Sequence, residues 1–552
     1  MKKNSFINDS FISIMGIVVC KVIGLLYVIP FYAMISTIGG TLYSYAYSIY
    51  TLFLSLSTSG IPAAISKLIS EYEALDYKKT TVNMFKVGFI LISILGLVGF
   101  ILMMIFAPQL SHFIIGKMKG GATIADTAFV VRLIATALLI VPALSVTKGY
   151  FQGKKMFKEA AVANIIEQGA RVGFLLLGCY LCLNKFNLGE RAAIGAAVFS
   201  ATVGALIAYL YLVIKQKQDH LKISSKGIER KKEELKLDTK FLAKQLIATA
   251  IPFVLIDLLK SAYGIVDALT INRAMTYLGY NATETMTAYN TFITWGAKLA
   301  MIVISISMGL TISLIPNIAK DNIKGNKSGV NHKINLSIEL LTFVTLPMAI
   351  GMSILGKPIW ILFYKYNAVS ISVFKFFIYT AASFAIYSVV INIAQTLNHT
   401  KQVLITLTSA FLLNLIGNIP CMILVHRLGY GAYHGAVVST LITELGPALL
   451  LLYYIKRQHG LKFKELYINI GKILISSFAM VGGLKILSHF YPLVAMDRKG
   501  SIIEVIIYVI VGGLIYLFFS YITGLLGEMI GEKIPMKLRF LSKILIKLRL
   551  TK

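Results

Sequence analysis

The sequence predicts an all-α membrane protein of about 14 transmembrane helices, with two six-helix lobes, two further C-terminal helices and both termini in the cytoplasm. Hydrophobic residues make up 57% of the 552 residues and the mean hydropathy is +0.77, yet the formal net charge is +30. A soluble domain cannot hide so much apolar surface in one core, whereas a membrane protein combines apolar spans with basic loops. The positive charge therefore indicates anionic lipid and membrane topology, and not nucleic acid.

The first span is expected from Phe11 to Ser36, where a single charge, Lys21, interrupts the apolar run. At about 1.5 Å per helical residue, this stretch is longer than the hydrocarbon core requires. The run is also too long for the core of a signal peptide, so we expect the segment to be retained.

Pro62 falls inside the second expected span, two residues after Gly60, where we expect a kink, and Pro142 falls inside the fourth. The spans expected after the first are Ser44–Ile69, Val87–Ala107, Phe129–Gly149, Ala160–Leu183, Ala192–Ile214, Phe241–Leu269, Phe292–Ile315, Ile334–Leu355, Phe374–Ala394, Val403–Val425, Ala436–Ile455, Ile468–Leu487 and Ile502–Leu525.

Charged segments divide this series into domains. We expect an N-lobe at 1–214, a basic cytoplasmic linker at 215–240, a C-lobe at 241–456, two extra helices at 457–530 and a basic tail at 531–552. Lys and Arg are several times more numerous in the loops on the side of the N-terminus, which places both termini in the cytoplasm. The tail is either an amphipathic helix lying on anionic phospholipid or an unstructured basic segment.

The two expected lobes also contain short loops at corresponding places. The fourth and fifth spans join through GYFQGKKMF, and the tenth and eleventh join at the corresponding place through QTLNHTKQ. Parallel six-helix repeats of this kind place a substrate cavity between two lobes that alternate access to the two sides of the membrane.

Charged residues inside the spans are candidate functional residues, because a charge is costly in lipid. Lys21 lies about 15 Å along its helix, so we favour a cavity position over snorkelling to the headgroups. Lys298 has the same two interpretations. For Lys67, near the cytoplasmic end of the second span, a headgroup contact is favoured over the cavity mouth.

Three pairs of polar residues share helical faces. Asp257 and Lys260, in a span that also carries Asp267, either form a structural pair or line a site, and Glu167 and Arg171 are expected to form an internal ion pair. Asn414 and Asn418 are explained by interhelical hydrogen bonds or by a cation site near the kink expected at Pro420.

No enzyme motif or cofactor motif is found. The sequence contains no phosphate-binding glycine loop, no H-E-x-x-H and no nucleophile elbow, so we expect a protein that is not an enzyme. Cys179 and Cys182 form a C-x-x-C in a hydrophobic setting, which favours two small apolar residues over a redox or metal site. Any work the protein does must be driven by an ion gradient, by the membrane potential or by the supply of substrate. The expected coupling ions are Na⁺ or H⁺.

The segments SGIPAAISKLISEY (59–72) and TKGYFQGKKMFKEAAVANIIEQGARV (147–172) resemble the polysaccharide-transporter branch of the multidrug/oligosaccharidyl-lipid/polysaccharide exporter superfamily. Within that branch, the chain is most similar to the Gram-positive group of MurJ-type lipid II flippases and stage V sporulation protein B. The resemblance implies a cationic central cavity, flipping of undecaprenyl-pyrophosphate-linked sugars, and a location in the bacterial cytoplasmic membrane.

The resemblance also implies roles for individual residues. Lys21 and Lys298 stand where such flippases carry essential arginines, and Lys keeps the charge but loses the bidentate phosphate contact. Asp257, Asn414 and Asn418 loosely match a sodium site of some relatives, although Asn418 carries no charge.

We therefore expect a lipid-linked oligosaccharide as the substrate, and among these the peptidoglycan precursor lipid II. Two alternatives stay open: a cation-coupled multidrug exporter of the same superfamily, and a membrane scaffold without transport activity that binds cell-wall synthesis proteins. The scarcity of acidic residues in the N-terminal spans argues against the exporter, and the lysines inside the spans argue against the scaffold.

Overall fold

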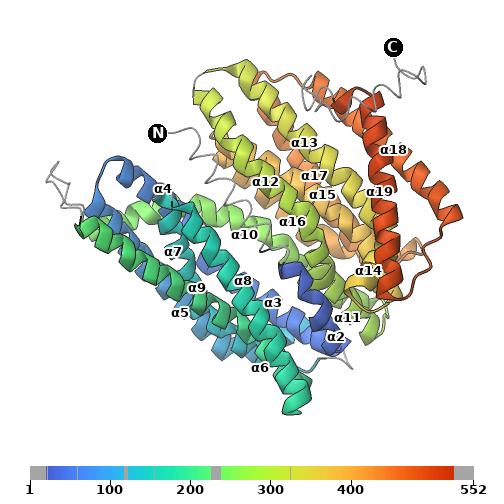
Figure 1. Cartoon of the computed structure of the whole chain (residues 1–552), viewed down its shortest axis with the longest axis horizontal. Coiled ribbons are helices and arrows are strands. Elements are labelled where there is room, and N and C mark those ends of the chain that lie inside the picture. The colour runs from blue at the N-terminus through green and yellow to red at the C-terminus, as the bar shows by residue number, and fades with distance from the viewer. Residues whose placement is uncertain are drawn as a thin grey trace. The chain divides into compact units, whose positions relative to one another are not determined.

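The computed structural model describes residues 20, 23–58, 60–116, 122–154, 156–225, 238–323 and 325–526, and all regular structure in them is helical (Figure 1). Eleven of the described helices are long and apolar enough to cross a membrane, and Ile23–Met34 is a shorter apolar helix. The all-helical, multi-pass membrane architecture is thereby confirmed. The total of 14 spans and the cytoplasmic position of both termini stay predictions.

The chain forms two compact units. Unit 1 contains residues 1–298 and 407–440, and unit 2 contains residues 299–406 and 441–552. This division does not follow the expected linker at 215–240, because the first helix after the linker packs against helices of the N-terminal half. The helices of unit 1 are α2 (Val28–Met34), α3 (Thr37–Thr58), α4 (Ile61–Ala74), α5 (Lys78–Ile115), α6 (Ile124–Ala135), α7 (Val141–Gly153), α8 (Phe157–Tyr180), α9 (Gly189–Ser225), α10 (Thr239–Tyr277) and α11 (Ala282–Asn290).

Three helices have residues in both units. Helix α12 (Gly296–Ile323) enters unit 2 after Lys298, α16 (Thr400–Arg427) enters unit 1 at Leu407, and α17 (Ala432–His459) returns to unit 2 at Leu441. The helices that lie wholly in unit 2 are α13 (Lys327–Ile354), α14 (Gly356–Phe363), α15 (Ala368–Thr396), α18 (Lys464–Phe490) and α19 (Arg498–Ile522).

The second expected span is broken and not merely kinked. Helix α3 ends at Thr58 and α4 begins at Ile61, with Gly60 at a φ of 72° and Pro62 in the first turn of α4. Glycine adopts a positive φ without steric penalty, and proline tolerates the first helical turn, so this pair separates two helices. Helix α4 then packs closely on α7, where a Cβ at Gly149 would lie 2.7 Å from the Pro62 carbonyl oxygen.

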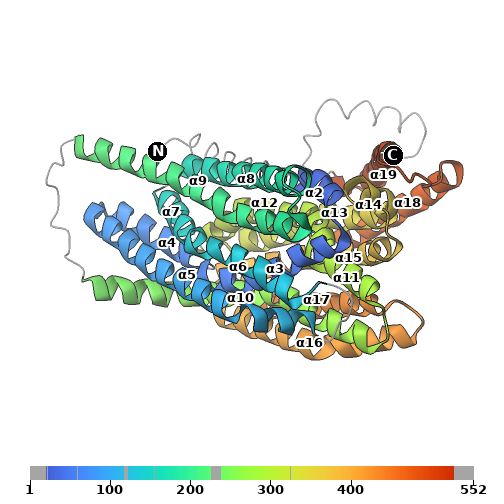
Figure 2. The ribbon, with the colours of Figure 1, turned by 90° about the horizontal axis from the view of Figure 1, so that it is seen from below.

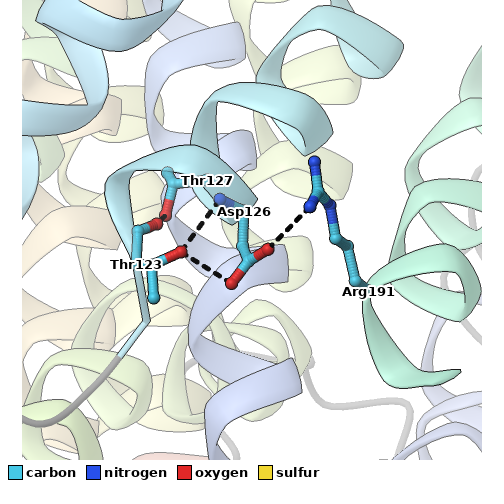
Figure 3. A network of polar contacts seen from close by, with 4 residues as sticks. All are labelled: Thr123, Asp126, Thr127 and Arg191. Atoms are coloured by element: carbon cyan, nitrogen blue, oxygen red, sulfur yellow. Dashed lines mark hydrogen bonds and ion pairs between the residues drawn. The ribbon is translucent and has the colours of Figure 1, made fainter.

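The fourth expected span also divides. Helix α6 is followed by a 3-10 turn at Thr136–Leu139, and α7 starts with Pro142 in its first turn. At the start of α6 the Thr123 hydroxyl accepts a hydrogen bond from the Asp126 amide at 3.1 Å, and the Asp126 carboxylate pairs with Arg191 of α9 at 3.3 Å (Figure 3). This N-cap fixes where α6 begins and ties it to α9.

The linker at 215–240 stays a prediction, and the structure shows helix at both of its ends. Helix α9 continues to Ser225 and α10 starts at Thr239, so both ends of the linker are helical. Lys and Gln are good helix formers, and no glycine or proline stands between Lys215 and Ser225 to stop the helix.

Helices α8 and α9 lie side by side in both views (Figures 1 and 2).

In unit 2, the two C-terminal helices expected from the sequence are present as α18 and α19, which pack against each other (Figure 1). The Tyr516 hydroxyl of α19 donates to the Phe343 carbonyl of α13 at 2.8 Å, and the Tyr508 hydroxyl donates to the Tyr491 carbonyl at 2.7 Å. These bonds place the polar ends of two buried rings against backbone acceptors, as buried tyrosines require.

Candidate functional site

Lys298 contacts three buried tyrosines of unit 1. Its Nζ donates a hydrogen bond to the Tyr27 hydroxyl at 2.5 Å, and it lies 4.5 Å from the Tyr27 ring centroid, 5.4 Å from Tyr32 and 5.2 Å from Tyr43. An ammonium group over an aromatic face is held by the negative potential of the ring. The side chain of Lys298 therefore points into the helix packing of unit 1.

Arg171 of α8 contacts a neighbouring tyrosine from another helix. Its guanidinium group donates to the Tyr47 hydroxyl and lies 5.2 Å from the centroid of that ring. The rings of Tyr43 and Tyr47 are 4.5 Å apart, and the hydroxyl oxygens of Tyr27 and Tyr43 are 3.4 Å apart. Tyr27, Tyr32, Tyr43 and Tyr47, here called the tyrosine cluster, thus connect Lys298 with Arg171.

The spacing of the tyrosines on α3 explains their shared face. Tyr43, Tyr47 and Tyr50 are separated by four and three residues, which places them on one side of a helix. This periodicity is readable in the segment LYSYAYSIY, and it is the pattern that the sequence analysis missed.

The two cations have no acidic partner among the described residues. The ion pairs found there join Lys78 with Asp76, Lys148 with Glu167, Arg191 with Asp126 and Lys333 with Asp321. Glu167 was expected to pair with Arg171, but its carboxylate lies 2.5 Å from the Lys148 ammonium group of α7. The expected Glu167–Arg171 ion pair is therefore replaced, because α7 brings a second cation to Glu167 while Arg171 lies against Tyr47.

Small polar side chains on another face of α3 contact α11 and the π-turn that follows it at Thr291–Trp295. The Asn290 amide donates to the Thr41 hydroxyl at 2.8 Å, and the Thr294 hydroxyl donates to the Ser44 hydroxyl at 2.7 Å. These contacts fix the segment that precedes Lys298 against α3.

A second polar group lies between α10 and α16. The Asn418 amide donates to the buried Asp267 carboxylate at 2.7 Å, and the Asn414 amide lies 3.4 Å from the Ser439 hydroxyl and 3.5 Å from the Thr440 hydroxyl of α17. The Asn418 Oδ1 atom is buried and has no hydrogen-bond partner in the described part. One carboxylate with nearby amide and hydroxyl oxygens is a ligand set suited to a hard cation.

Asp267, which was not part of the predicted cation site, is the carboxylate that contacts Asn418. The predicted place of Asp257 in this site stays a prediction. The side chains of Asp257 and Lys260 lie outside the described part of the structure. Asp267 was noticed in the sequence, but nothing in its local pattern distinguished it.

The other candidate residues are distributed differently. Lys21 and the basic tail at 531–552 lie outside the described residues. Lys67 is exposed on α4, a position that neither of its two interpretations excludes. Cys179 is buried and donates to the Ala193 carbonyl at 3.3 Å. No group of three or more His, Cys, Asp or Glu residues that could hold a metal ion occurs in the described part.

Comparison with known proteins identifies related sequences. Residues 6–293 match the model of a family described as polysaccharide biosynthesis protein. The chain is 29% identical to a protein named lipid II flippase MurJ from Bacillus subtilis (strain 168), over 96% of this chain and 98% of the relative. It is also 27% identical to stage V sporulation protein B of the same organism, over 39% of each chain.

Solved structures match the fold. A structure titled lipid II flippase MurJ, inward closed conformation, aligns with a TM-score of 0.66 at 16% identity, covering 92% of this chain and 98% of that one. An inward-facing multidrug resistance MATE family transporter of the MOP superfamily aligns with a TM-score of 0.62 at 13% identity, covering 80% and 94%. The chain therefore has the fold that these two structures share, and it is a multi-pass protein of the cytoplasmic membrane.

Proposed function

Because the chain belongs to the polysaccharide biosynthesis protein family, we propose that it is a flippase for undecaprenyl-pyrophosphate-linked sugars, with lipid II as its substrate. The observation that carries this proposal is Lys298, a partly buried cation held by tyrosine hydroxyl and ring groups and by no carboxylate of the described residues. An uncompensated cation in the interior of a membrane protein favours an anionic ligand. The relative named lipid II flippase supports the same substrate.

In the proposed mechanism, Lys298 contacts the pyrophosphate, Lys21 contacts it from the first helix, and Lys67 receives the headgroup on the cytoplasmic side. Lys contributes a compact charge with three donors, which suits a phosphate group that must later be released. The prenyl chain stays in lipid. The expected lobes 1–214 and 241–456 alternate access to the two membrane faces.

We further propose that a cation, Na⁺ or H⁺, couples to this cycle at Asp267, Asn418 and Asn414. The Asn418 amide now presents its nitrogen to Asp267, while its buried oxygen lacks a partner in the described part. Rotation of that amide by half a turn would present its oxygen instead, which suits a bound Na⁺. The residues present thus fit a cation, whose charge would neutralise the buried carboxylate.

Complementation of a bacterial strain depleted of its lipid II flippase tests the function. The wild-type chain is expected to restore growth, and Lys298→Met is expected to fail at equal membrane abundance. Arg132→Gln is the matched control, because Arg132 is exposed on α6 and only donates to the Met104 carbonyl at 3.3 Å in the described structure. This control should restore growth.

Other outcomes identify the alternatives. Growth supported by Lys298→Met would contradict the role of Lys298. Failure of the wild-type chain, combined with changed drug susceptibility of a deletion strain, would support the multidrug exporter that the MATE-like fold also allows. Failure with unchanged drug susceptibility and unchanged lipid II distribution would support a scaffold for cell-wall synthesis proteins.

A further inference from the structure

We propose that Ser501 and Glu504 of α19 form a binding site for Ca²⁺ beneath the loop 491–497, which joins α18 to α19. The two residues are one helical turn apart, so their side chains lie on the same face of α19. Both residues belong to unit 2, whereas Lys298, which carries the proposed function, belongs to unit 1. The inference therefore does not depend on the proposed function.

Both side chains are buried, and each has an oxygen atom without a partner. Glu504 is 3% exposed and Ser501 is fully buried. The Oε1 atom of Glu504 accepts a hydrogen bond from the Ala495 amide at 2.8 Å. The Oε2 atom of Glu504 and the Oγ atom of Ser501 have no hydrogen-bond partner in the described part of the structure. A buried charge is costly unless it is paired or binds a metal ion, so this carboxylate indicates a ligand.

The donors that neighbouring side chains offer are directed to the loop backbone. The Lys357 ammonium group of α14 donates to the Leu493 carbonyl at 3.2 Å, and the Tyr508 hydroxyl donates to the Tyr491 carbonyl at 2.7 Å. Glu504 takes part in none of the ion pairs between described residues. A cation supplied from solution would therefore compensate a charge that the neighbouring side chains leave unpaired.

The loop is fixed over the first turns of α19. The Asp497 carboxylate accepts hydrogen bonds from the Lys499 and Gly500 amides at 3.1 Å and 3.2 Å, which caps the start of the helix. A Cβ atom at Gly500 would lie 3.0 Å from the Ala495 Cβ, so the loop packs directly on this turn. The loop therefore covers the face of α19 that carries Glu504, and its carbonyl oxygens are further ligands that the fold makes available.

The ligand chemistry favours Ca²⁺ among the hard cations. Carboxylate, hydroxyl and carbonyl oxygens are its usual ligands, whereas Mg²⁺ keeps several waters that a covered site does not accommodate. A divalent ion also interacts more strongly than Na⁺ with a single buried carboxylate. One charged ligand gives a weak site, with a dissociation constant of about 10⁻⁴–10⁻³ M, as in extracellular calcium modules. The predicted topology places the loop 491–497 on the outer side of the membrane.

Hydrogen exchange of the purified full-length protein in detergent tests this inference, followed on peptides that cover residues 490–500. Calcium chloride, sodium chloride and choline chloride are compared at equal ionic strength and fixed pH. Ca²⁺ at ten times its dissociation constant should slow exchange of the loop amides about tenfold, because protection rises with the factor 1 + [L]/Kd. Sodium and choline should not slow the exchange.

Two variants test the ligands, and two others are matched controls. Glu504→Gln should abolish the protection by Ca²⁺, although its remaining carbonyl oxygen can still accept from the Ala495 amide. Ser501→Ala should move the protection to higher Ca²⁺ concentration. Glu465→Gln removes an exposed carboxylate of α18 and should keep the wild-type response, as should Asp267→Asn, which alters the polar group of α10.

Three results would overturn the inference. The first is absence of protection by Ca²⁺ in the wild-type chain, or protection by sodium alone. The second is undiminished protection in Glu504→Gln. If Glu504→Gln does not fold, an unchanged Ca²⁺ dependence in Ser501→Ala is the third.

Discussion

Replacement of Lys298 with Met is expected to abolish substrate binding while thermal stability is unchanged or raised. The variant loses one charge-assisted hydrogen bond to Tyr27, worth about 1.5–3 kcal/mol, and contacts with three tyrosine rings. Those ring contacts contribute about 1–2 kcal/mol together. Against these losses stands the desolvation penalty of an uncompensated ammonium group, which is several kcal/mol when buried.

The lost contacts and the removed desolvation penalty change the free energy of unfolding in opposite directions and nearly cancel. Met also packs well against aromatic rings, so the free energy of unfolding should change by less than about 1 kcal/mol or should increase. The assay is thermal unfolding of the purified protein in detergent, followed by intrinsic fluorescence at fixed pH and salt concentration.

The matched control is Lys333→Met, which removes a lysine that does have an acidic partner. Lys333 pairs with Asp321 at 2.7 Å, and Asp321 is mostly buried. Removal of Lys333 leaves the Asp321 carboxylate without this partner, so the free energy of unfolding of the control should fall by about 1–3 kcal/mol. The reasoning is refuted if Lys298→Met lowers the unfolding midpoint as much as Lys333→Met does, because Lys298 would then be a structural residue.

Three further predictions follow from particular contacts. Asp267→Asn should remove any stabilisation by Na⁺, measured as the difference in unfolding midpoint between sodium and choline salts, and an unchanged difference would argue against this cation site. Burial lowers the pKa of the His399 imidazole, which lies between α15 and α16 and contacts His459 at 2.8 Å. Protonation therefore favours the unfolded chain, so this contribution to stability is present above the ordinary histidine pKa of about 6.5 and is lost as the pH falls below it. In thermal unfolding experiments between pH 8 and pH 5, His399→Gln should weaken the dependence of the unfolding midpoint on pH. An unchanged dependence would contradict the assignment of this effect to His399. Gly149→Ala should destabilise the protein by about 1–3 kcal/mol, because the added Cβ would lie 2.7 Å from the Pro62 carbonyl, and a neutral effect in denaturation assays would show that α4 can move away from α7.

The sequence predicted the helical membrane architecture because long apolar runs are a local property of the chain. The same local reasoning failed at Gly60 and Pro62, where a kink was expected and a break between α3 and α4 occurs. Helix α9 continues beyond the expected span Ala192–Ile214 to Ser225, because the residues of this charged segment favour helix.

The candidate site was only partly predictable. Lys298 was identified because a charge inside an apolar run is conspicuous in the sequence. Arg171 was assigned to an ion pair with Glu167, because the spacing between residues on one helix cannot reveal that Lys148 of another helix is the nearer partner of Glu167. Asp267 was passed over for the same reason, since its contact with Asn418 depends on the packing of α10 against α16.

The most direct test of the central claim measures how lipid II is distributed between the two leaflets. In cells depleted of their own flippase, the wild-type chain is expected to restore exposure of lipid II on the outer face of the cytoplasmic membrane. Lys298→Met, present at the same level, is expected to leave lipid II on the inner face. Equal exposure in cells carrying either chain, or no exposure with the wild type, would contradict the account.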